Sequence, residues 1–191
     1  MALISDELRE VHCRVVYFGA SLSGKTTNLT YIHQQAPTVA RGNVLTIPAD
    51  AEAATSFDFL PIDVGTVDGY RVRLQLYAVP GQTVGSHSHA TLIKHADGVV
   101  FVADSQRERF VECLQSHLEM TRILEACHQG IDSIPLVIQY NKRDLPDAIP
   151  VPILNARLNP ANAPSFEAIA TTGVGVFPTL QAISQALLER L

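Results

Sequence analysis

A glycine-rich loop that ends in lysine and threonine stands near the N-terminus, where residues 19–26 read GASLSGKT. It follows an apolar, β-rich run at 11–18 and precedes a segment at 26–35 whose apolar residues have helical spacing. In nucleotide-binding proteins, the phosphate-binding loop lies between a strand and a helix in this order. The free N–H groups at a helix N-terminus, together with the helix dipole, favour a bound anion. The loop is therefore predicted to bind the phosphates of a nucleotide.

The residues at the end of this loop have predicted roles of their own. Lys25 adds a positive charge directed toward the β- and γ-phosphates. The Thr26 hydroxyl is placed to bind Mg²⁺, which bridges phosphate oxygens and retains several waters. Six backbone N–H groups are expected to surround the β-phosphate, those of Leu22, Ser23, Gly24, Lys25, Thr26 and Thr27.

A second motif, Asn-Lys-Arg-Asp at 141–144, directly follows an apolar run that ends at Tyr140. The Asp144 carboxylate can accept hydrogen bonds from both N1–H and the exocyclic amine of guanine, whereas adenine offers neither donor there. A site built for these donors leaves its polar groups unpaired when the wrong base binds. Asn141 is expected to tie this segment to the phosphate-binding loop, and the Lys142 stem to lie along the base. The predicted ligand is therefore GTP or GDP.

A further contact to guanine is expected after the last strand. Residues 170–173 read ATTG, and the backbone N–H of Ala170 is the candidate donor to guanine O6. The phosphate-binding loop alone leaves ATPases, nucleotide kinases and GTPases open. The combination of the two motifs favours a guanine nucleotide, and an adenine-specific enzyme remains as an alternative that competition binding would test.

The remaining pattern predicts an α/β fold, a P-loop G domain with a mostly parallel six-stranded sheet and helices on both faces. Asp68-Gly69 favours a tight hairpin turn. The apolar residues of the segments 37–54 and 81–97 have neither helical nor strand periodicity, and these segments are interpreted as loops. Strands are expected at 11–18, 57–67, 70–79, 98–103, 134–140 and 166–170, and helices at 26–35, 107–128, 151–158 and 178–191.

Length and composition are typical of one globular domain over residues 1–191, with 47% hydrophobic and 17% charged residues. The net charge of −5, without any basic run, argues against nucleic acid as a partner. The three cysteines are interpreted as reduced thiols of a cytoplasmic protein. The sequence contains no export signal and no membrane span. Position 2 is Ala instead of the glycine that myristoylation requires, and a prenylation cysteine is lacking, so no direct membrane anchor is expected.

The chain resembles the MglA-type small GTPases of bacteria, Ras-like switches that govern cell polarity and gliding motility. The resemblance covers nearly the whole chain. It implies a GTP/GDP switch with bound Mg²⁺, whose regulator is a roadblock-fold dimer (MglB-like) that stimulates hydrolysis. The runs that carry it are GKTTNL at 24–29, FDFLP at 57–61, VPGQ at 79–82, DGVVFVADS at 97–105, QYNKRDLP at 139–146 and TGVGVF at 172–177.

Several positions depart from this family in ways that bear on hydrolysis. Ala53 and Ala54 stand where the family has an arginine finger and a threonine, and no arginine occurs from 42 to 70. An arginine finger raises the rate by about 10³ to 10⁵ in GTPases that use one. Thr55 lies one residue out of register and recovers the magnesium contact only if the loop shifts.

The catalytic side of the loop differs as well. Ser21 replaces a glycine that leaves room beside the γ-phosphate, and Ala78 removes the hydroxyl that the family usually has there. Magnesium would then rest on Thr26, phosphates and water. Gln82 is retained and resembles the residue that orients the attacking water.

Two interpretations of this pattern remain. The favoured one is a guanine-nucleotide switch with slow or partner-dependent hydrolysis, in which water attacks the γ-phosphate in line. The alternative is a hydrolysis-deficient scaffold that binds GTP or GDP and remains in one state. Both interpretations assign nucleotide binding to the same residues.

Overall fold

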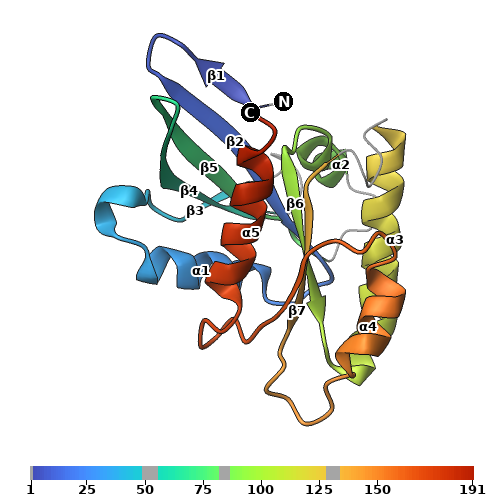
Figure 1. Cartoon of the computed structure of the whole chain (residues 1–191). Coiled ribbons are helices and arrows are strands. Elements are labelled where there is room, and N and C mark those ends of the chain that lie inside the picture. Colours follow the sequence, from blue (N-terminus) through green and yellow to red (C-terminus); the bar gives the residue numbers. More distant parts are fainter. Residues whose placement is uncertain (1, 49–55, 82–86, 128–133) are drawn as a thin grey trace.

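The computed structural model describes residues 2–48, 56–81, 87–127 and 134–191, which form one eight-stranded sheet with helices on both faces (Figure 1). The strands are β1 Leu3–Ser5, β2 Glu10–Phe18, β3 Leu45–Pro48, β4 Ser56–Val67, β5 Tyr70–Ala78, β6 Gly98–Asp104, β7 Leu136–Asn141 and β8 Ser165–Glu167. The helices are α1 Lys25–Gln35, α2 His87–Lys94, α3 Phe110–Ala126, α4 Val151–Leu158 and α5 Val176–Leu188, with short 3₁₀ helices η1 Thr38–Ala40 and η2 Arg107–Arg109.

Strand order across the sheet is β3-β4-β5-β2-β6-β7-β8, and β1 pairs with β2 outside this path. Strands β5, β2, β6, β7 and β8 run parallel, whereas β3-β4-β5 is antiparallel, as is β1 to β2. The predicted α/β fold is confirmed, but the sheet has eight strands rather than six because β1 and β3 join it. Both sequence motifs follow parallel strands, β2 and β7, so they lie at the same edge of the sheet.

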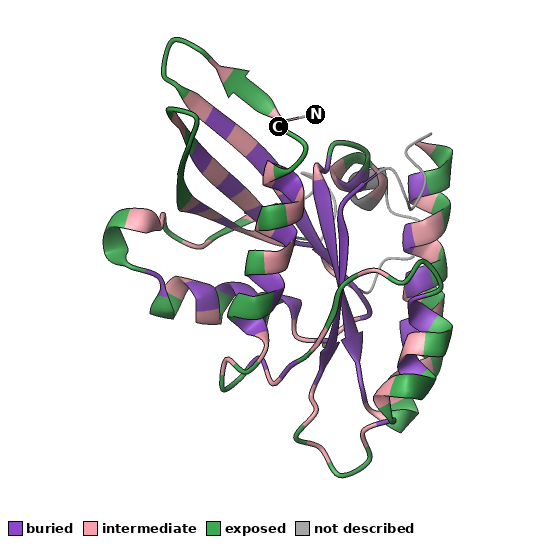
Figure 2. Ribbon diagram, in the orientation of Figure 1, coloured by how far each residue is buried: buried purple, intermediate pink, exposed green. Residues whose placement is uncertain are grey.

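Alternation along β2 divides the core into two layers. Val15 and Tyr17 face one cluster together with residues of α1 and α5, while Val16 and Phe18 face the other with residues of α2, α3 and α4. Figure 1 shows these two helix groups on opposite faces of the sheet. Strands β6 and β7 are buried along their whole length, which Figure 2 shows as continuous purple, as expected for strands covered on both faces.

Two segments interpreted as loops contain regular structure. Within 37–54, η1 forms a short turn and β3 pairs antiparallel with β4, with Leu45 opposite Phe59. Leu45, Thr46 and Pro48 are exposed, so this edge strand has no alternating burial that a sequence pattern would show. Within 81–97, residues 87–94 form α2. The loop interpretation was therefore wrong for these parts of the two segments.

Element boundaries elsewhere differ from the predicted ones by a few residues. Helix α4 has the predicted bounds, whereas the last strand is β8 at Ser165–Glu167 instead of 166–170. After Glu167 the ladder ends: the Ala168 N–H still donates to the Tyr140 carbonyl, but Ile169 forms an isolated bridge with Val174 and the Ala170 N–H donates to the side chain of Asn141. Among the described residues, no helix is both long enough and apolar enough to cross a membrane.

Candidate nucleotide-binding site

The phosphate-binding loop joins the buried end of β2 to the N-terminus of α1, as the sequence predicts. Gly19 and Gly24 have φ values of 151° and 104°, in the region that favours glycine. A Cβ at Gly19 would overlap the carbonyl oxygen of Val102, and one at Gly24 would overlap the side-chain amide of Asn141. Glycine at these two positions is therefore required by both backbone conformation and packing.

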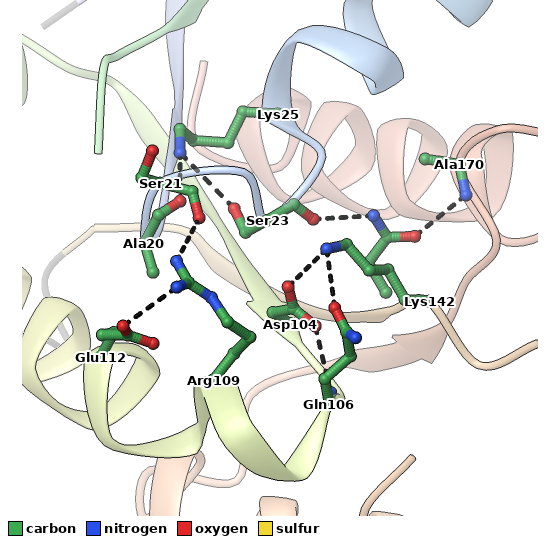
Figure 3. A network of polar contacts seen from close by, with 11 residues as sticks. Ala20, Ser21, Ser23, Lys25, Asp104, Gln106, Arg109, Glu112, Lys142 and Ala170 are labelled. Atoms are coloured by element: carbon green, nitrogen blue, oxygen red, sulfur yellow. Dashed lines mark hydrogen bonds and ion pairs between the residues drawn. The ribbon is translucent and has the colours of Figure 1, made fainter. Parts of the chain in front are cut away.

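Lys25 is buried inside this loop, only 6% exposed. Its Nζ donates to the carbonyl oxygen of Gly19 at 2.8 Å. It also donates to the carbonyl oxygen of Ala20 at 2.6 Å (Figure 3). Burial lowers the pKa of Lys25 to about 8, because the charged form loses solvation. No acidic residue occupies the first turn of α1. The buried ammonium and the helix N-terminus together make this end of the site favourable for an anion.

Thr26 meets a carboxylate that sequence reasoning did not single out. Its hydroxyl donates to Oδ2 of Asp58 at 2.6 Å, and the hydroxyl of Thr46 donates to Oδ1 of the same carboxylate at 2.9 Å. Asp58 lies on β4, directly opposite Ala78 on β5. The structure thus brings an oxygen ligand beside Thr26 from a neighbouring strand. Only strand register places it there, so no local sequence pattern could have indicated it.

Two adjoining cavities follow the edge of the sheet. One, of about 350 Å³, is lined by the end of the loop together with Asp58 and Gly81. The second, of about 250 Å³, is lined by predicted base-contacting residues. Leu22, Gly24 and Thr27 line both cavities. The predicted phosphate and guanine contacts therefore belong to one continuous groove.

Asn141 connects the two ends of this groove. Its side-chain Nδ2 donates to the carbonyl oxygen of Ser23 at 2.8 Å, and its Oδ1 accepts from the Ala170 N–H at 2.9 Å. The Ala170 N–H, the candidate donor to guanine O6, is therefore bonded to Asn141 in this structure. Thr171 lines the same cavity.

Lys142 is held by the end of β6. Its Nζ lies 2.6 Å from Oδ2 of Asp104, which is fully buried, and 3.1 Å from Oε1 of Gln106 (Figure 3). The residue has a positive φ of 63°, which is uncommon for a side chain with a Cβ. Asp144 is exposed and lines the second cavity.

Two predicted residues have no place in the described structure. Gln82 and Thr55 lie outside the described residues, as do Ala53 and Ala54. Their described neighbours, Ser56 and Gly81, line the larger cavity. Gly81 packs so closely on the backbone of Ala20 and Ser21 that a Cβ there would overlap it. Across the described part of the chain, no group of three or more His, Cys, Asp or Glu could hold a metal ion.

Two comparisons with known proteins identify the family of this chain. A family model described as "ADP-ribosylation factor family" matches residues 2–190. The "Mutual gliding-motility protein MglA" of Myxococcus xanthus (strain DK1622) is 44% identical over 193 residues, an alignment that spans 100% of this chain and 98% of that protein. The chain therefore belongs to the ADP-ribosylation factor family of small GTPases, as an MglA-type member.

Proposed function

We propose that this protein is a guanine-nucleotide switch that binds GTP and GDP in the groove between residues 19–27 and 141–144. The observation that carries the proposal is the contact between the two motifs, the 2.8 Å hydrogen bond from Asn141 to Ser23. This bond joins the two ends of the groove. One end has Lys25 and the N-terminus of α1, which favour phosphates, and the other has the exposed Asp144 carboxylate, which can accept from the two donors of guanine.

Competition binding tests this proposal directly. A fluorescent GDP analogue is displaced with GDP, GTP, ADP and ATP, and guanine nucleotides are expected to compete at least about a hundredfold better because adenine lacks the two donors that the Asp144 carboxylate accepts from guanine. Asp144→Ala is expected to remove most of that preference. A preference for adenine nucleotides would instead support the alternative of an adenine-specific NTPase or kinase.

The residues present suit a magnesium ion bound together with the nucleotide. Mg²⁺ prefers oxygen ligands and keeps several waters, so it needs few protein groups. The Thr26 hydroxyl would bind it directly, and Asp58 would hold the ion or its waters from the position opposite Ala78. When bound, the ion neutralises charge on the phosphate oxygens.

Hydrolysis is proposed to be slow or dependent on a partner. Gln82 supplies a group that can orient the attacking water, but no arginine lies between 42 and 70. A roadblock-type, MglB-like regulator is the partner that the family resemblance favours. The competing proposal is a scaffold that binds the nucleotide without cleaving it.

Single-turnover GTP hydrolysis, measured with and without a roadblock-type protein, distinguishes the two versions. The switch version predicts a rate that rises with the partner and falls with Gln82→Ala. A rate that neither change affects would favour the scaffold. The nucleotide that co-purifies provides an independent check, because retained GTP indicates that hydrolysis is slow.

The MglA relative suggests the process in which the switch acts. We propose a role in cell polarity or gliding motility, exercised in the cytoplasm, where GTP is available and the free cysteines stay reduced. Replacing the chromosomal gene with a Lys25→Ala allele is expected to abolish gliding or polar localisation of motility proteins. Normal motility in that strain would refute this role.

A further inference from the structure

Arg109 reaches across the fold to the phosphate-binding loop. It is the last residue of η2, immediately before α3, and lies 88 positions along the chain from Ser21. Its Nη2 donates to the Ser21 carbonyl oxygen at 3.1 Å, and its Nη1 donates to Oε1 of Glu112 at 3.0 Å (Figure 3). The planar guanidinium is thus held at two points, which fixes the direction of the bond to Ser21.

The bond to Ser21 has a consequence for the next residue. In a trans peptide the carbonyl and the following N–H point in opposite directions, and the described residues contain no cis peptide bond. Because the Ser21 carbonyl points toward Arg109, the Leu22 N–H points away from it. Leu22 lines both cavities of the groove, at the point where they adjoin.

The backbone of Leu22 also needs support. Its φ of 61° places it in the left-handed region, which a residue with a Cβ adopts only at a cost in free energy. Such conformations persist where surrounding contacts hold them, and they concentrate at ligand-binding sites. The Arg109 bond to the adjoining carbonyl is a contact of this kind.

We propose that Arg109 is a positioning residue that, by holding the Ser21 carbonyl, directs the Leu22 N–H at the β-phosphate of the bound nucleotide. This inference rests on the proposed nucleotide site. Arg109 does not line either cavity, so it acts through the backbone rather than by touching the phosphates. A donor fixed before binding loses no conformational freedom when the ligand arrives, and affinity rises accordingly.

The test compares affinities for GMP, GDP and the slowly hydrolysed analogue GTPγS, in the wild type and in Arg109→Gln. GMP lacks a β-phosphate, so its affinity is expected to stay within about twofold of the wild-type value. GDP and GTPγS are both expected to bind about tenfold more weakly, the usual effect of losing one hydrogen bond to a charged group. Displacement of a fluorescent GDP analogue gives all three affinities.

Two further variants separate positioning from charge. Arg107→Gln removes the same charge two residues away, from an exposed side chain, and is expected to change no affinity by more than about twofold because surface charges are screened. Arg109→Lys keeps the charge but lacks the planar guanidinium that bonds to both Ser21 and Glu112. It is therefore expected to bind GDP and GTPγS almost as weakly as Arg109→Gln does. Thermal unfolding of each nucleotide-free variant checks that the domain itself is intact.

Each remaining outcome would overturn the proposal. A loss confined to GTPγS would mean that Arg109 contacts the γ-phosphate itself. A loss that includes GMP, or full recovery in Arg109→Lys, would mean a general or purely electrostatic effect, and no loss would mean that the contact is only structural. Failure of the wild type to bind any guanine nucleotide would refute the proposed function instead.

Discussion

Asp58 of β4 lies directly opposite Ala78 of β5 in the antiparallel ladder, and its carboxylate accepts a hydrogen bond from the Thr26 hydroxyl at 2.6 Å. Residues opposite each other in such a ladder project from the same face of the sheet at short distance. Ala78 has no side-chain oxygen to offer a magnesium ion, and Asp58 on the neighbouring strand supplies one in its place. The absence of a polar side chain at 78 therefore does not by itself remove the magnesium site.

Asp58→Asn is expected to raise the magnesium concentration needed for tight nucleotide binding by about ten- to a hundredfold, as for other groups that orient metal ligands. The measurement is the rate of GDP release against magnesium concentration. Asp63→Asn, on the same strand but paired with Arg71 away from the groove, is the matched control and should leave the titration unchanged. Equal curves for wild type and Asp58→Asn would contradict this assignment.

Nucleotide affinity is expected to depend on the protonation of Lys25. Burial lowers its pKa to about 8 in the nucleotide-free protein, whereas bound phosphate favours the ammonium. Below pH 8 the ammonium is already present, so affinity is constant. Above pH 8 binding requires proton uptake, and affinity falls by up to about tenfold per pH unit.

The measurement is the dissociation constant for GDP between pH 7 and 9, in wild type and in Lys25→Met. Lys25→Met is expected to bind GDP more weakly at every pH. The guanine N1–H of GDP titrates in both measurements, so the slope of the variant gives the contribution of the ligand. A wild-type slope no steeper than that of Lys25→Met would count against the role of Lys25.

Stability is expected to fall in mild acid because of His117. This residue of α3 is 6% exposed, packs edge-on against Phe101, and its Nε2 has no hydrogen-bond partner among the described residues. Burial lowers the pKa of His117 below its ordinary value of 6.5. The unfolded chain therefore binds a proton at higher pH than the folded one, so stability is lost as pH falls below 6.5, by at most about 1.4 kcal/mol per unit.

Urea unfolding at pH 7.5, 6.5 and 5.5 measures this loss. His117→Leu is expected to flatten the profile, since it removes the titrating group and keeps an apolar contact with Phe101. His95→Gln, at an exposed histidine, should keep the wild-type slope. If His117→Leu retained the full slope, another group would be responsible.

Asn141→Ala is expected to weaken both the fold and the site. It leaves the Ser23 carbonyl and the Ala170 N–H without their side-chain partner, at about 1–3 kcal/mol for each buried group left unpaired. GDP affinity should fall with it, since the two ends of the groove are no longer joined. Calorimetric binding and urea unfolding measure the two effects separately.

Asn159→Ala is the matched control for this variant. Its amide bonds to Asn155 and Ala163 near the end of α4, and it lines neither cavity of the groove. The variant should have a lower free energy of unfolding, because the polar groups of Asn155 and Ala163 lose their partner. Its GDP affinity should stay within about twofold of the wild-type value, because these groups lie outside the groove. Equal losses of affinity in both variants would show that Asn141 acts only through global stability.

Sequence alone determined the parts of this protein that depend on neighbouring residues. The turn at 19–26 needs glycines at two positive φ angles before a helix, and the wholly apolar strand at 98–103 must be buried on both faces. These requirements are local, so the order of residue types along the chain is enough to predict the loop, the buried strands and the two motifs.

Tertiary structure alone decided how distant segments meet. The position of Asp58 opposite Ala78 depends on the register of a ladder, and the bond from Arg109 to Ser21 depends on how α3 packs beside the loop. Edge strand β3 has no alternating burial, so it becomes regular only by bonding to β4. Such pairings follow from the assembled sheet and its packed helices, and no spacing of residues along the chain encodes them.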